Sequence, residues 1–205
     1  MHLNRAELTK KIPVPRKGTK YVVRALNNVS EGVPVLIAIR DILGLAKDAR
    51  EVKSMIHNKL IKINGNVVKD YREPVKIFGI LDAGNRYVLT IKETGRFAFE
   101  ETKQDYRLAK ILNKKMVKNK TIQLNLHDGT NINYSKEAFV GDTVKLGFDN
   151  KIKEILHPKK GNSVFIFSGK NLGKHGKIKE MENKKYTLIL EDKEVQIDQS
   201  HLIIA

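Results

Sequence analysis

The sequence predicts an α+β protein dominated by strands, and three observations lead to that fold class. Two short stretches, residues 34–45 and 49–59, carry apolar residues at helical spacing. Directly after them, Asn64-Gly65 lies between apolar pairs and favours a two-residue hairpin turn, because both residues tolerate positive φ. Beyond residue 120, alternating segments separated by turn residues are typical of short antiparallel strands.

The first helix is expected to begin at Pro34, which suits a first turn, and to end at Gly44. Its apolar positions recur every three or four residues, at Leu36, Ile39, Ile42 and Leu43. Asp48 is placed to cap the second helix. That helix should bury one face and keep its basic residues outward; the buried face consists of Val52, Met55 and Ile56.

Most of the remaining chain is expected to form strands. Residues 73–91 predict two of them, joined by a turn at Ala83-Gly84-Asn85. The strongly basic link at residues 103–120 fits a helix or a strand. Further alternating segments, joined by turns at Asp128-Gly129 and Asp149-Asn150, predict a small antiparallel barrel and a second unit of similar style; they span residues 121–134, 142–156 and 163–205.

The first 33 residues are basic and lack apolar periodicity. Pro13, Pro15 and Gly18 interrupt any regular element there. We expect this segment to be an extended basic arm.

The charge balance indicates a polyanionic partner. The chain has 205 residues with 39 Lys+Arg against 23 Asp+Glu, a net charge of +16. The excess is spread over the whole chain, which suits an extended phosphate surface. Aromatic residues make up only 6% and tryptophan is absent, so recognition through RNA shape and phosphates is favoured over base stacking. The chain lacks cysteine, a signal-peptide core and any membrane-length apolar run, so we expect a cytoplasmic protein without membrane contact.

No pattern of catalysis, cofactor or metal binding is found. His127-Asp128 is followed by glycine and reads first as a hairpin turn, with no nucleophile beside it. The six histidines show no metal-ligand spacing. The glycine-rich stretch "SGKNLGKHGKI" lacks the GKS or GKT of a phosphate-binding loop and leads into a strand-like run. We therefore expect no enzyme activity and no cofactor.

Two stretches resemble known RNA-binding modules. The unit from Pro34 to Leu81 resembles the S-four-type domain, in which two helices pack on a hairpin; the matching features are Arg50 at the start of the second helix and "IKINGNVVKD". The stretch "SGKNLGKHGKI" resembles the KOW motif of SH3-like barrels. Its glycines permit tight turns and close backbone approach.

Taken in order, "HLNR", "AKDAREVKSMIHNKLIKINGNVVKD", "IQLNLHDGTNI", "VGDTV" and "SGKNLGKHGKI" resemble the small-subunit ribosomal protein four-e family, most closely its archaeal members. The resemblance implies a structural protein that binds small-subunit rRNA beside neighbouring ribosomal proteins, without self-assembly. It implies four segments: the arm (1–33), an S-four-type domain (34–95), a central small barrel with its link (96–158) and a KOW/SH3-like barrel (159–205). The alternative is an accessory protein of RNA modification or transcription elongation that uses the same modules.

The candidate RNA-binding residues are all basic. One positive face should consist of Arg40, Lys47, Arg50, Lys53, Lys59, Lys62 and Lys69. Further contacts are expected from the arm (Arg5, Arg16, Lys17 and Lys20), the link (Lys114, Lys115 and Lys118) and the C-terminal loop (Lys170, Lys174 and Lys177). Arg50 is the strongest candidate, because a guanidinium can grip phosphate bidentately. The competing interpretation is a surface ion pair between Arg50 and Asp48.

Overall fold

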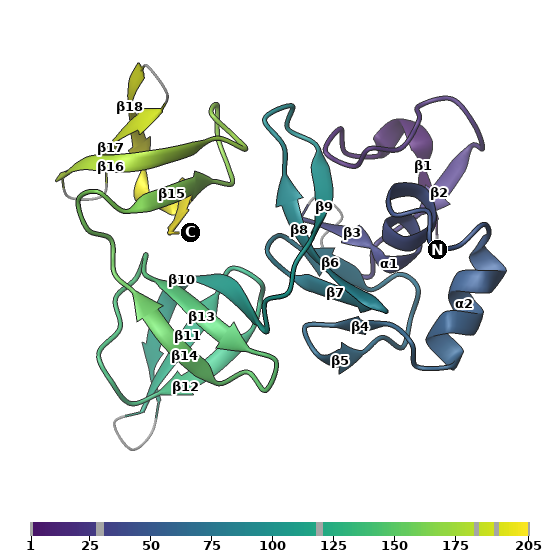
Figure 1. Ribbon diagram of the computed structural model, residues 1–205, viewed down its shortest axis with the longest axis horizontal. Helices are drawn as coiled ribbons and strands as arrows, with labels where there is room; N and C mark the ends of the chain where they lie inside the picture. Colours follow the sequence, from purple (N-terminus) through teal and green to yellow (C-terminus); the bar gives the residue numbers. More distant parts are fainter. Residues whose placement is uncertain (1, 28–30, 118–120, 183–184, 191–192, 205) are drawn as a thin grey trace. The chain divides into compact units, whose positions relative to one another are not determined.

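The computed structural model describes residues 2–27, 31–117, 121–182, 185–190 and 193–204, and strands dominate it (Figure 1). The chain divides into two compact units, Met1–Gln104 and Asp105–Ala205. The first unit holds the two α-helices and the second unit, in its described part, holds strands and one short 3₁₀ turn. The predicted strand-dominated α+β class is confirmed.

The N-terminal segment is not extended, and that prediction is wrong. Strands β1 (His2–Asn4) and β2 (Tyr21–Val23) pair antiparallel, so the segment folds back on itself. Ile12 and Ala25 are buried in the first unit, and the backbone N–H of Phe97 donates to the carbonyl of Lys11 at 2.7 Å. The segment is thus held against the unit by two isolated buried residues and by backbone hydrogen bonds, which leave no apolar periodicity in the sequence.

The first helix forms where the sequence predicts it, but its α-helical part is short and is followed by a wider π-helical turn. Strand β3 (Gly32–Pro34) leads into α1 (Val35–Ile37), which continues as a π-helical turn over Ala38–Ile42. Every residue from Val33 to Ile39 is buried, apolar and core-facing. Gly44 ends the helix with φ at +66°, and the N–H of Leu45 reaches back to the carbonyl of Ile39.

The second helix, α2 (Ala49–His57), begins at the predicted cap. The Asp48 carboxylate accepts the N–H groups of Arg50 and Glu51. Val52 is fully buried, whereas Met55 and Ile56 are only half-buried, so the predicted buried face is narrower than expected. The helix ends at His57 with Asn58 as its C-cap; the next residue, Lys59, takes a left-handed φ of +58°, and the N–H of Leu60 donates to the carbonyl of Met55.

The predicted hairpin has the expected turn, with Asn64 at φ +51° and Gly65 at φ +83°. The segment 73–91 contains three strands rather than two, because Phe78 buries its ring at a left-handed φ and breaks the first run. The first unit contains a five-stranded sheet of order β5-β4-β7-β8-β9 and the pair β3-β6. Their bounds are β4 (Lys62–Ile63), β5 (Asn66–Val67), β6 (Pro74–Lys76), β7 (Ile80–Ala83), β8 (Asn85–Ile91) and β9 (Phe97–Glu101). The sheet thus extends to Glu101, beyond the expected domain end at 95.

The basic link, open between helix and strand from sequence, is a strand. It forms β10 (Tyr106–Met116), the centre of a sheet of order β12-β11-β10-β13-β14. The other strands are β11 (Ile122–Leu126), β12 (Asn131–Tyr134), β13 (Thr143–Gly147) and β14 (Ile152–Leu156). Its core includes Ala109, Ile111, Leu124, Val144 and Leu146. The turns at Gly129 and Asn150 take the left-handed φ that the sequence indicates.

A second five-stranded antiparallel sheet completes this unit, in the order β18-β17-β16-β15-β19. Its strands are β15 (Ser163–Ile166), β16 (His175–Glu182), β17 (Lys185–Leu190), β18 (Lys193–Asp198) and β19 (Leu202–Ile204). Val164, Ile166, Ile178 and Leu188 lie at its core. The last strand ties the two sheets together, because the N–H of Ile204 donates to the Thr143 hydroxyl at 3.0 Å.

Candidate nucleic-acid interface

Arg50 is held at the start of α2 with its side chain exposed. The Asp48 carboxylate accepts hydrogen bonds from the backbone N–H groups of Arg50 at 2.7 Å and of Glu51 at 2.9 Å. Both bonds lower the pKa of Asp48, and the bond from Glu51 has the larger effect. Among the described residues, no carboxylate forms an ion pair with the Arg50 guanidinium. Asp48 therefore acts first as a helix cap, and the attraction of the Arg50 guanidinium is the smallest cause of its lowered pKa.

The basic residues around the hairpin are also exposed, whereas apolar residues between them are buried. Val52, Ile61 and Val68 are at most 1% exposed. One side of this segment thus packs into the core, and the other side presents cations. The exposed basic side chains are those of Lys47, Lys53, Lys59, Lys62 and Lys69.

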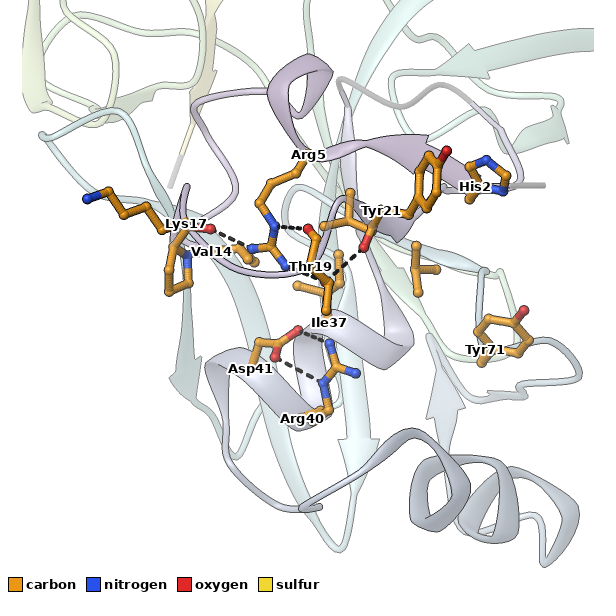
Figure 2. A pocket seen from close by; sticks show the side chains of 13 residues that line it. His2, Arg5, Val14, Lys17, Thr19, Tyr21, Ile37, Arg40, Asp41 and Tyr71 are labelled. Carbon is orange, nitrogen blue, oxygen red and sulfur yellow. Dashed lines mark hydrogen bonds and ion pairs between the residues drawn. The ribbon is translucent and has the colours of Figure 1, made fainter.

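Two predicted site arginines are already engaged within the first unit. The Arg40 guanidinium binds the Asp41 carboxylate through Nε at 3.0 Å and Nη2 at 2.8 Å, which raises the Arg40 pKa. The Arg5 guanidinium donates to the carbonyl of Pro15, the carbonyl of Thr19 and the Thr19 hydroxyl (Figure 2). Arg5 thus closes the loop between β1 and β2, a role that sequence reasoning missed.

The other arm cations, Arg16, Lys17 and Lys20, are exposed. The Lys20 ammonium lies 5.3 Å from the centre of the Tyr21 ring. Elsewhere in the same unit, the Lys53 ammonium lies 4.9 Å from the centre of the Tyr71 ring. Cations and tyrosines therefore occur together twice in the first unit.

The basic link contains two cations that the structure buries, Arg107 and Lys110. Arg107 is 4% exposed; its Nε lies 3.1 Å from the Asp128 carboxylate, and its Nη2 donates to Thr130 and Asn150. From sequence, both residues belonged to a link described only as strongly basic. Side chains alternate between the two faces of a strand, so Arg107 lies on the same face as the buried Ala109 and Ile111. This alternation is the sequence signal that indicates the burial of Arg107.

Lys110 is 2% exposed and joins the two sheets of its unit. Its ammonium donates to the backbone carbonyls of Gln199 and Leu202, which flank the short turn before β19. Burial lowers the pKa of Lys110 to about 8, and the nearby Asp198 opposes that shift. The two carbonyls replace the water that the ammonium loses.

The remaining predicted contacts lie in the second unit. Lys114 and Lys115 are exposed near the end of β10, and the Lys114 ammonium donates to the carbonyl of Ala138 at 3.3 Å. Lys118 lies outside the described residues. In the glycine-rich stretch, Lys170 and Lys177 are exposed and Lys174 is half-buried.

The glycines of this stretch behave as expected from sequence. Gly169 and Gly173 take left-handed φ values of +91° and +83°. A Cβ at Gly176 would lie 2.7 Å from Leu190 and 3.1 Å from the Ile189 carbonyl, so only glycine admits β17 so closely. The loop joins β15 to β16, which are strands rather than the strand and helix of a phosphate-binding loop.

His127 and Asp128 lie in the turn between β11 and β12 and serve the fold. His127 Nδ1 accepts the N–H of Lys110 at 3.1 Å, and Asp128 binds Arg107. Within the described ranges, no group of His, Asp and Glu side chains is arranged to hold a metal ion. None of the helices described is long and apolar enough to cross a membrane.

Comparison with known proteins identifies the family. The sequence model of the ribosomal family S4e matches residues 83–152. The small ribosomal subunit protein eS4 of Methanocaldococcus jannaschii is 33% identical over 200 residues, covering 89% of this chain and 82% of that protein. The protein of the same name from Archaeoglobus fulgidus is 34% identical, covering 87% and 79%. The chain belongs to the S4e family.

The fold agrees with that of a solved S4e protein. The crystal structure of the 30S ribosomal protein S4e from Thermoplasma acidophilum matches with a TM-score of 0.73 at 23% identity, covering 85% of this chain and 95% of that one. The stretch matched by the S4e sequence model includes β10 and therefore both buried cations, Arg107 and Lys110. The expected resemblance to archaeal members of the family is confirmed.

The buried Lys110 predicts a specific pH dependence of stability. Its folded pKa of about 8 lies below the ordinary 10.5, so the unfolded chain binds more protons between these values and stability gains as pH rises. We expect the difference in unfolding free energy between wild type and Lys110→Met to grow in favour of wild type from pH 8 to 10.5, by on the order of 3 kcal/mol. Chemical denaturation at fixed pH values measures it.

The matched control is Lys115→Met, which removes an exposed lysine from the same strand. Its difference from wild type should stay nearly constant over that range. A Lys110→Met difference that does not change with pH would contradict the assignment.

Proposed function

We propose that this protein is a structural constituent of the small ribosomal subunit, where it binds small-subunit rRNA and contacts neighbouring ribosomal proteins without catalysing a reaction. The observation that carries the proposal is the set of exposed cations from Lys47 to Lys69, in a segment whose apolar residues Val52, Ile61 and Val68 are buried, in a chain of the S4e family. Relatives along nearly the whole chain are named ribosomal proteins, so the alternative of a modification or elongation accessory protein is not favoured.

The S-four-type module is the proposed primary contact. Two helical segments and the Asn64-Gly65 hairpin supply its frame, and Arg50, Lys53 and Lys62 project into solvent. Such an arrangement suits structured RNA, because phosphates on a helical backbone are read by spaced cations rather than by a deep pocket. Arg50 is the preferred phosphate-binding residue, since its guanidinium is exposed and forms no ion pair with a carboxylate of the described residues.

Arg5 and Arg40 have different proposed roles from the other candidates. Arg5 positions the arm, because the described hydrogen bonds of its guanidinium go to Pro15 and Thr19. Arg40 is neutralised by Asp41 as a bidentate pair, so it contributes less net charge to the face. The remaining arm residues Arg16, Lys17 and Lys20 keep the proposed phosphate role.

The second unit supplies further proposed contacts. Its two five-stranded sheets fit a central small barrel followed by a KOW/SH3-like barrel, with the proposed boundary at 158/159 between β14 and β15. Lys170, Lys174 and Lys177 lie on and beside the glycine-rich loop of the latter sheet. Because Gly176 lets β17 pack closely against the start of β16, the lysines of the loop are attached to a well-packed part of the sheet.

Lys59 gives an independent argument for function at the hairpin. It follows the C-cap of α2 in the left-handed region at φ +58°, where glycine would be unstrained. A non-glycine residue in this region costs of the order of 1–3 kcal/mol, and such strain is concentrated at functional sites. An exposed lysine at this position is therefore better explained by a ligand than by stability.

The first test is association with the ribosome. We expect the tagged chain, expressed in an archaeal host, to sediment with the small subunit and to remain there through a high-salt wash: salt weakens each phosphate contact, but contacts spread over the whole chain must all be released before it dissociates. Sucrose-gradient fractions probed for the tag give the result. A chain found only in the soluble fractions, or with the large subunit, would overturn the proposed function.

The second test concerns Arg50. We expect Arg50→Ala to weaken binding to small-subunit rRNA by roughly tenfold, the contribution of a charged hydrogen-bonded contact. The slope of log affinity against log salt should fall by about one, because each neutralised phosphate contributes roughly 0.7 to 0.9. Filter binding of the purified chain over a salt series measures both.

The matched control is Arg96→Ala, which removes an exposed arginine of the same unit from the turn between β8 and β9. Its affinity should change little. If Arg50→Ala, still folded by circular dichroism, binds rRNA as tightly as wild type, the module is not the contact surface.

The third test separates stability from binding at Lys59. We expect Lys59→Gly to raise the unfolding free energy by about 1 kcal/mol, because the left-handed strain at the end of α2 is relieved. The same variant should bind rRNA several-fold more weakly. Urea denaturation and filter binding give the two numbers, and Lys59→Asn, which tolerates this φ, should behave like Lys59→Gly. A stabilised variant with undiminished binding would remove Lys59 from the site.

A further inference from the structure

The first unit contains a pocket of about 440 Å³ between the arm and the first helix (Figure 2). Its volume falls within the roughly 300–1,000 Å³ that is usual for small-ligand sites. The arm contributes β1, β2 and the loop between them, and the opposite side consists of Ile37, Arg40 and Asp41 together with Tyr71. The pocket is therefore made by segments that are far apart in the sequence.

Aromatic rings line one end of this pocket. Figure 2 shows Tyr21 and His2 close together, with Tyr71 on the same side and Lys17 at the other end. The His2 and Tyr21 ring centres are 4.0 Å apart, and Tyr21 is 45% exposed. The two rings are tilted by 54°, and the partly exposed phenol ring offers a surface on which a planar ligand can stack.

A lysine lies near each of the two tyrosine rings, and Lys17 lines the pocket itself. The Lys20 ammonium lies 5.3 Å from the Tyr21 ring centre, and the Lys53 ammonium lies 4.9 Å from that of Tyr71. Flat rings flanked by lysines match the two parts of a nucleotide, since the base stacks and the phosphate is attracted by positive charge. In a protein with 6% aromatic residues and no tryptophan, this grouping stands out from the phosphate-binding surfaces.

The pocket also offers a hydrogen-bond acceptor. Asp41 is held by the two-point contact with Arg40, and its side chain remains 25% exposed. Each carboxylate oxygen has a second lone pair, which can accept an N–H from the edge of a base. The Arg40–Asp41 pair thus fixes an acceptor near the apolar Ile37.

The shape of the pocket is set before any ligand arrives. The Arg5 guanidinium donates at 2.6 Å to both the Pro15 and the Thr19 carbonyls and closes the arm loop. Gly18 takes φ +140°, and a Cβ there would lie 3.2 Å from the Arg5 guanidinium carbon. A preformed site loses less ordering entropy when it binds.

We infer that this pocket binds one unstacked nucleobase, which stacks on Tyr21 while its phosphate is held by the surrounding lysines. The inference rests on the proposed function, because that function supplies the RNA. It adds a base-binding site to a protein whose other proposed contacts are to phosphates.

NMR of the full chain with ¹³C-labelled tyrosine rings tests this directly. The probes are six-residue oligouridine and oligoadenosine, with ribose 5-phosphate as the probe that has a phosphate and no base. We expect both oligonucleotides to shift the Tyr21 and Tyr71 ring signals and ribose 5-phosphate to leave them nearly unchanged. Tyr106, whose ring lies 5.6 Å from the Lys145 ammonium but outside the pocket, is the internal control and should move less.

Two variants separate stacking from charge. Tyr21→Leu should weaken oligonucleotide binding between roughly fivefold and one hundredfold, the contribution of one stacked base. Tyr21→Phe keeps the ring and should bind within about twofold of wild type. Equal shifts from ribose 5-phosphate, or unchanged affinity of Tyr21→Leu, would overturn the base-binding site. Either result could occur while small-subunit rRNA still binds through Arg50, so failure here is distinguishable from failure of the proposed function.

Discussion

A buried cation is stabilised by oxygen atoms that replace its water, and the second unit depends on two such cations in β10. Lys110 is surrounded by the carbonyls of Gln199 and Leu202, and Arg107 by Asp128, Thr130 and Asn150. An ammonium or guanidinium without these partners would lose several kcal/mol on burial. The partners come from distant segments, so each cation joins parts of the chain that apolar packing alone would hold only loosely.

The same cost keeps the other described cations at the surface. With a net charge of +16, the chain has many more cations than carboxylates to pair them with. In the segment from Lys47 to Lys69, the apolar residues go inward and the basic residues stay in solvent. The basic residues of this segment are therefore exposed without an ion pair in the described structure, whereas other surface cations, such as Arg40, Arg72 and Lys179, are paired with carboxylates.

At Lys59, the residue that suits the proposed function differs from the residue that would best stabilise the fold. Lys59 occupies a backbone conformation that glycine would adopt without strain. A ligand that uses the lysine offers a reason to keep it. The preceding helix of the same unit ends with glycine, Gly44, which adopts the same left-handed conformation without strain.

The local elements were largely determined by the sequence itself. The Asp48 cap, the glycine end at Gly44 and the Asn64-Gly65 turn depend on neighbours within a few residues, so each could be predicted correctly. The exposed candidates Arg50, Lys53 and Lys62 also followed, because a helix or hairpin with one apolar side leaves its charges on the other. Motifs distributed along the chain indicated the S4e family.

Only the tertiary structure decided what depends on contacts between distant residues. The fold-back of the arm rests on β1–β2 pairing and on two buried residues, which produce no periodic signal. The roles of Arg5, Arg107 and Lys110 rest on oxygen atoms that lie between 10 and 92 positions away in the chain. Whether a basic residue binds phosphate or supports the core is set by which oxygens surround it after folding, and residue spacing carries no record of that.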